Sequence, residues 1–132
     1  MQLSKFTDYS LRMLIYMAEH PDRLVTINEV AQWYGTPKQH FVKIAHNLVK
    51  LGYVKSMRGK GGGLCLNKKP EEINLGKVVR ETEPNFRIVE CFDEAHVSCR
   101  ITGTCKLKGV LRESVRQFYD VLDRNSLSSI IA

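Results

Sequence analysis

The 132-residue sequence predicts a mainly α-helical fold with one small β-hairpin wing. Three observations predict it. Apolar residues recur at helical intervals in three short segments before residue 51, two strand-like segments flank a glycine-rich stretch, and a long amphipathic segment follows residue 105. This order is typical of a winged helix-turn-helix unit followed by a long dimerisation helix. We expect the unit over residues 1–80, a cysteine-bearing loop over 81–104, and the helix with a C-terminal tail over 105–132.

The first two helices are short and have recognisable ends. Apolar side chains recur at helical spacing over about residues 6–20, and Pro21 closes that segment. Thr26 is a good N-cap for a second helix that continues to Trp33 or Tyr34, and Gly35 is a good terminator for it. We therefore expect two helices joined by a short turn ahead of residue 35.

The third helix is predicted over residues 37–50. Thr36 is an N-cap candidate, and Pro37 suits the first helical position because it has no backbone N–H to leave unpaired. One side of this helix is apolar, whereas the other carries polar and cationic residues, namely Lys38, Gln39, Lys43 and Asn47 or Lys50. The pattern is that of a recognition helix, which enters the major groove of DNA.

A hairpin is predicted directly after this helix, with strands over residues 51–57 and 63–67. Between them, Arg58-Gly59-Lys60-Gly61-Gly62 forms the tip. Glycine allows a positive φ and close approach to a DNA backbone or minor groove, while Arg58 and Lys60 supply charge. A nucleotide-binding phosphate loop is the competing interpretation. It is disfavoured because a helix must follow such a loop, and a strand pattern follows here.

The positive charge of the chain is concentrated in this region. Residues 37–69 contain eight Lys and Arg and no acidic residue, so this segment carries +8 and the remainder −2 of the net +6. Such a patch suits a polyanion, because each cation placed on a phosphate releases a condensed counterion. A solvated basic face would explain the charge alone. The recognition helix and wing in the same segment favour double-stranded DNA as the partner.

The four cysteines fall into two groups. Cys65 lies between two leucines in the second predicted strand, and we expect a small, partly buried apolar residue. Cys91, Cys99 and Cys105 lie within 15 residues in a polar, turn-rich segment. In a cytosolic chain such clustering favours a metal over a disulfide. The spacing leaves an iron–sulfur cluster, a structural zinc and free reactive thiols open.

The segment after Cys105 continues as an amphipathic helix for about five turns. A chain this short offers little core for such a helix to cover, so pairing with a second copy is the economical interpretation. Packing on the chain's own first helix is the alternative. A homodimer also suits DNA, because it presents two recognition helices to two half-sites.

Other classes of protein are disfavoured by what the sequence lacks. The longest apolar run, residues 13–18, is far shorter than a membrane span, and residues 1–5 show no secretory signal pattern. We therefore expect a cytoplasmic protein without a membrane partner. The four histidines are scattered and suggest no nucleophile with a matched base, so we expect no enzymatic activity.

Several motifs together carry a resemblance that covers nearly the whole chain. They are Phe6-Thr7-Asp8-Tyr9 with Leu11-Arg12, His40-Phe41-Val42-Lys43-Ile44, Gly52-Tyr53-Val54, Arg58-Gly59-Lys60-Gly61-Gly62-Gly63, Gly76-Lys77-Val78-Val79-Arg80 with Glu83-Pro84, and the three-cysteine segment. In these residues the sequence resembles the family of winged-helix repressors that includes NsrR, IscR and the cluster-free CymR. The wing motif combined with three spaced cysteines is the specific part of this resemblance.

The resemblance implies a cofactor and a ligand set. IscR-like members place a histidine three residues after the third cysteine, where this chain has Lys108. NsrR-like members use a carboxylate at the start of the first helix, donated across the dimer, and Asp8 stands at that position. The implied cofactor is a 4Fe-4S cluster, with 2Fe-2S as the alternative, held by Cys91, Cys99, Cys105 and Asp8. His96 is a second candidate for the fourth ligand, and an ordinary helix N-terminal acid is the other interpretation of Asp8.

The expected function follows from the resemblance and the basic segment together. We expect a dimeric repressor whose cluster senses nitric oxide, with Gln39 and Lys43 at base edges, Lys38 and His40 close by, and Arg58 and Lys60 at the groove or backbone. A related repressor sensing iron–sulfur status or redox state is the alternative. A cluster-carrying electron-transfer protein or small oxidoreductase is a third interpretation, disfavoured because such a protein has no use for a basic wing.

Overall fold

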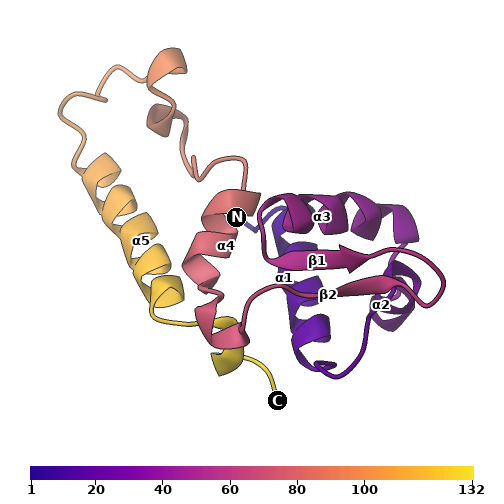
Figure 1. Ribbon diagram of the computed structural model, residues 1–132. Helices are drawn as coiled ribbons and strands as arrows, with labels where there is room; N and C mark the ends of the chain where they lie inside the picture. Colours follow the sequence, from indigo (N-terminus) through magenta and orange to yellow (C-terminus); the bar gives the residue numbers. More distant parts are fainter.

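Five α-helices and one two-stranded antiparallel hairpin make up the structure, a computed structural model that describes residues 1–132. Figure 1 shows α1–α3 and the hairpin gathered on one side of α4, and α5 on the other. The mainly helical fold with a hairpin wing is confirmed. The elements in chain order are α1 (Lys5–Ala18), α2 (Ile27–Tyr34), α3 (Lys38–Lys50), β1 (Val54–Met57), β2 (Gly63–Leu66), α4 (Leu75–Thr82) and α5 (Lys106–Asp123).

The helix starts are set by short-range hydrogen bonds. The Ser4 side chain caps α1, and Thr26 forms a capping box with Glu29 at the start of α2. The predicted start of α3 was wrong by one residue. Pro37 occupies the N-cap position, and the Thr36 hydroxyl donates to the carbonyl of Tyr34 at 3.4 Å instead of capping the helix. The recognition helix therefore begins at Lys38.

The first predicted strand was three residues too long. The backbone N–H of Gly52 donates to Val49 and that of Tyr53 to Leu48, both at 3.0 Å, and Gly52 has a φ of +87°. These are the paired bonds of a Schellman motif, which ends α3. Residues 51–53 thus belong to the helix terminus, and β1 begins at Val54, paired with Leu66 of β2.

The core lies between α1, α2 and α3 and is closed by residues from later in the chain. Met13 and Leu14 of α1 pack with Phe41, Ile44 and Leu48 of α3, all of them inaccessible to solvent or nearly so. Further fully buried side chains come from the segment before α4, from α4 itself and from the C-terminal tail, namely Ile73, Val78 and Leu127. The tail therefore packs into the same core as the helix-turn-helix unit.

Helix α4 was not predicted from the sequence. Asn74 caps it by accepting a hydrogen bond from the backbone N–H of Lys77 at 2.9 Å, and its buried residues include Leu75, Val78 and Val79. It packs between α1 and α5. The predicted division at residue 80 falls inside this helix, which ends at Thr82.

Helix α5 has the predicted length of about five turns but contains no buried residue. Its main contacts within the chain are with α4 and the residues that flank α4. Phe86 stacks on Phe118 with ring centroids 5.0 Å apart, and Arg80 forms a bidentate ion pair with Asp123 at 2.6 and 2.8 Å. That guanidinium holds the pKa of Asp123 below its usual value. Neither α5 nor any other helix has the length and apolar character that crossing a bilayer requires.

We expect Leu127→Ala to lower the free energy of unfolding by about 2–5 kcal/mol, because it opens a cavity where the tail meets the core. Urea unfolding at fixed protein concentration measures this. Ile130→Ala is the matched control, since that side chain is 44% exposed and its truncation removes little buried surface. Equal stability of the two variants would contradict the assignment of the tail to the core.

Candidate functional site

The recognition helix presents the predicted polar residues to solvent. Lys38, Gln39, His40 and Lys43 are all exposed, while the neighbouring Phe41 is fully buried. The helical repeat separates these two sets because the apolar side chains of α3 face α1 and α2. The cationic side of α3 is therefore available to a partner, as the sequence predicted.

The wing carries two further exposed cations, and its strands lie across a groove from the start of α3. Arg58 and Lys60 are exposed in the hairpin tip, where Gly59 and Gly61 have φ values of +100° and +78°. A groove of about 290 Å³ separates the wing from the helices, and Lys38 lines it together with residues of α2, β1 and β2. Helix and wing thus form one surface, with Lys38 at their junction.

A second groove, of about 340 Å³, lies between the first turn of α1 and the recognition helix. Gln39, His40 and Lys43 line it from α3, and Lys5, Phe6 and Tyr9 line it from α1. The Tyr9 ring meets His40 edge-on, with centroids 6.1 Å apart. Lys5 was not predicted as part of this surface, because it lies outside the basic segment 37–69 and only the packing of α1 on α3 places it beside the recognition helix.

The three clustered cysteines lie on the segment that arches from α4 to α5 in Figure 1. All are free thiols, and no residue from 83 to 105 is buried. Cys91 lies in a short 3-10 turn, Cys99 is exposed, and Cys105 is the N-cap of α5, where its Sγ accepts from the backbone N–H of Lys108 at 3.4 Å. Cys65 is half-buried in β2, consistent with its predicted packing role.

Hydrogen bonds hold parts of this segment together. Both the backbone N–H and the hydroxyl of Ser98 donate to Glu90, which lowers the pKa of that carboxyl. These two residues immediately precede Cys99 and Cys91 in the chain. His96 is highly exposed, and its Nδ1 lies 2.9 Å from Asp93, whose pKa the histidine lowers.

Asp8 is engaged within its own chain. Its two carboxylate oxygens accept from Arg12 at 2.9 Å each, and the bond raises the pKa of that arginine. The guanidinium also lies over the rings of Tyr9 and Tyr34, at 5.4 and 5.6 Å from their centroids. Arg12 is therefore held by aromatic contacts as well as by charge.

The predicted ligand set is not assembled in the single chain. Nowhere do three His, Cys, Asp or Glu side chains converge closely enough to hold a metal ion. The chemistry of the donors does fit an iron–sulfur cluster, since its usual ligands are cysteine thiolates and these three thiols are free and unburied. Core packing does not fix their present arrangement, because residues 83–105 contribute nothing to the core.

Comparison with known proteins assigns the chain to a family. Residues 3–132 match the Rrf2 family, described as iron-dependent transcriptional regulators. The chain belongs to the Rrf2 family. The transcriptional regulator NsrR of Bacillus subtilis is 46% identical over 132 residues, covering 99% of this chain and 90% of that relative. This Rrf2 protein is thus a transcriptional regulator and not an enzyme.

Solved structures of other regulators share the Rrf2 fold. IscR of T. potens superposes with a TM-score of 0.77 at 22% identity, covering 97% of this chain and 84% of that one. CymR, the global cysteine regulator of B. subtilis, superposes with a TM-score of 0.74 at 24% identity, covering 97% of this chain and 94% of that one. The helices, the wing and the long α5 therefore have the same arrangement as in these two solved structures.

We expect Gly62→Ala to weaken DNA binding by at least about tenfold, or roughly 1.4 kcal/mol. A Cβ on Gly62 would lie 2.3 Å from the carbonyl oxygen of Met57, so the wing turn would have to open. Fluorescence anisotropy with a duplex selected from a random-sequence pool measures the affinity. Gly103→Ala is the control, because its Cβ would meet no atom within 4 Å. Unchanged affinity of the Gly62 variant would remove the wing tip from the interface.

Proposed function

We propose that this Rrf2 regulator is a cytoplasmic, homodimeric repressor that binds operator DNA and carries an iron–sulfur cluster through which it senses nitric oxide. The observation that carries the proposal is that the cationic side chains and the free cysteine thiols lie on different parts of the chain. The cations of α3 and the wing lie on one surface, whereas the three free thiols lie on an unburied segment between α4 and α5. This division suits a regulator that reads DNA with one part of the chain and receives a signal with another.

Four residues would hold the cluster, which is 4Fe-4S by resemblance to NsrR. They are Cys91, Cys99 and Cys105 of one protomer and Asp8 of the other. A bound cluster would supply an iron open to nitric oxide, because the carboxylate oxygen of Asp8 would be a weaker and harder donor than a thiolate. Since Asp8 pairs with Arg12 in the single chain, that arginine competes with any other partner for the carboxylate.

The first turn of α1 connects Asp8 with the recognition helix. Tyr9, the next residue, packs against His40 and also against Phe41, with ring centroids 5.4 Å apart in the second pair. A change in the partner of Asp8 therefore acts on a turn that contacts α3 directly. If the dimer has two geometries with different DNA affinities, a shift of the population toward the weaker-binding geometry would relieve repression.

The homodimer is supported by α5. Leu107, Val110 and Val121 are at least half exposed along this helix, although each is apolar. A second copy of α5 is the partner that would cover these residues while placing two recognition helices on one duplex. Nitric oxide would then act on an assembly in which each protomer completes the other's ligand set.

Anaerobic reconstitution with iron and sulfide is expected to give a visible chromophore with about four iron atoms per protomer. Cys91→Ser, Cys99→Ser and Cys105→Ser should each reduce the bound iron and sulfide, because each removes a thiolate ligand. Cys65→Ser is the matched control and should keep the chromophore. Uptake of zinc without an iron–sulfur chromophore would refute the cluster, and two iron atoms per protomer would favour the 2Fe-2S alternative.

Asp8→Ala is expected to change the rate at which the reconstituted protein reacts with nitric oxide, because it removes the proposed oxygen ligand. Stopped-flow absorbance during anaerobic nitric oxide addition measures the rate. Asp22→Ala, a change of another acid in an exposed position after α1, should react like the wild type. If Asp8→Ala also reacts like the wild type, Asp8 has no part in sensing.

A further inference from the structure

The groove between α1 and α3 has a consequence for how the protein holds DNA. We propose that Lys5 makes a further contact with the phosphate backbone of the operator, and that Glu83 is the positioning residue that holds Lys5 for this contact. The inference deepens the proposed function and rests on operator binding. It assigns DNA contact to a helix outside the helix-turn-helix pair and its wing.

Lys5 lies opposite the recognition helix. Lys5 lies on the α1 side of the groove whose other side is formed by Gln39, His40 and Lys43 of the recognition helix. All four side chains are exposed, so Lys5 of α1 adds a cation to the polar surface of α3 across this groove. DNA docked on α3 would bring a strand of its backbone to this edge, because phosphates flank the groove that a recognition helix enters.

The charges at this edge suit a phosphodiester. Neither Lys5 nor Lys43 takes part in any ion pair of the chain. The acid of the same turn, Asp8, has both oxygens engaged by Arg12. Two free ammonium groups therefore line one groove, and the nearby carboxylate is neutralised, which reduces its repulsion of a phosphate.

Glu83 fixes the turn that carries Lys5. Its carboxylate accepts from the backbone N–H of Ser4 at 3.1 and 3.2 Å, from the Ser4 hydroxyl at 3.1 Å and from the Thr7 hydroxyl at 2.6 Å. Thr7 is fully buried, so this end of α1 is held on two sides. Lys5 lies between these two anchored residues, so its backbone is held at the edge of the groove.

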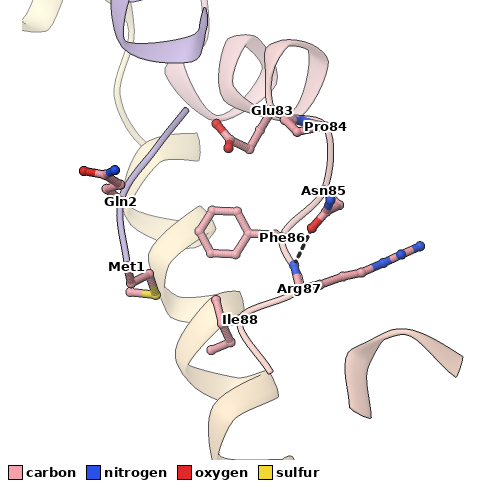
Figure 2. A pocket seen from close by; sticks show the side chains of 8 residues that line it. All are labelled: Met1, Gln2, Glu83, Pro84, Asn85, Phe86, Arg87 and Ile88. Carbon is pink, nitrogen blue, oxygen red and sulfur yellow. Dashed lines mark hydrogen bonds between the residues drawn. The ribbon is translucent and has the colours of Figure 1, made fainter. Parts of the chain in front are cut away.

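Glu83 also links this turn to the segment that carries the cysteines. It directly follows α4 and precedes Pro84 at the start of residues 84–105. Figure 2 shows Glu83, Phe86 and Ile88 on one side of a pocket, facing Met1 and Gln2 on the other. A displacement of the cysteine-bearing segment would thus act on the first turn of α1 through one carboxylate.

Salt titration of DNA binding tests the role of Lys5. With the full-length protein and a duplex selected from a random-sequence pool, log Kd is measured against log salt concentration. We expect Lys5→Gln to reduce the magnitude of the slope by about 0.9, the value for one lost phosphate contact. Lys77→Gln, at an exposed lysine of α4 outside both grooves, should leave the slope unchanged.

Two outcomes separate this inference from the proposed function. A wild-type slope for Lys5→Gln, together with salt-dependent binding by the wild type, would overturn the role of Lys5 alone. If the wild-type protein shows no salt-dependent binding to any selected duplex, operator binding itself fails and the inference fails with it.

A double-mutant cycle tests Glu83 as a positioning residue. Glu83→Gln should weaken binding about three- to tenfold, and adding Lys5→Gln should weaken it little further, because both changes remove the same contact. Amide hydrogen exchange of residues 5–8 should be faster in Glu83→Gln, with unchanged far-ultraviolet circular dichroism. Ser4→Ala, which removes one of the hydroxyl partners, supplies the same comparison if Glu83→Gln does not fold. Full additivity of the two changes would overturn the positioning role.

Discussion

Helix α1 buries Met13, Leu14 and Met17 in a core that α3, β2, α4 and the C-terminal tail all share. The recognition helix is placed by this contact, and so is α4, from which the cysteine-bearing segment departs. Burial of one apolar helix face, the dominant favourable contribution to folding, therefore sets the positions of both the DNA-reading surface and the proposed sensing segment.

The parts of the fold that the sequence predicts well are those with local causes. Thr26 and Gly35 delimit α2 through a capping box and a left-handed residue, and Gly59 and Gly61 of the wing tip have the positive φ that the glycine-rich pattern suggested. Where two local signals overlap, the prediction failed. Residues 51–53 have strand-like side chains, but Gly52 closes a Schellman motif that commits them to the end of α3.

The remaining features depend on tertiary contacts or on a second chain. Helix α4 spans only eight residues, and its burial comes from packing between α1 and α5. Lys5 joins the cationic surface only because α1 lies against α3. The exposure of Lys38, Gln39, His40 and Lys43 follows from helical periodicity alone. Cys91, Cys99, Cys105 and Asp8 remain a predicted ligand set, because neither spacing nor the single chain brings these four side chains together.

Helix α5 is joined to the buried core only at its C-terminal end. Near its C-terminus, Asp123 pairs with Arg80, and Leu127 is buried beside Ile73. Its other end, about 27 Å away for 18 residues, begins after Cys105 and contributes no buried residue. A helix joined to the core in this way has the geometry of a lever whose pivot lies on the DNA-binding unit. With such geometry, a small rotation at the pivot corresponds to a large displacement at Cys105. A large rearrangement of the cysteine-bearing segment would therefore change the position of the DNA-reading surface only slightly.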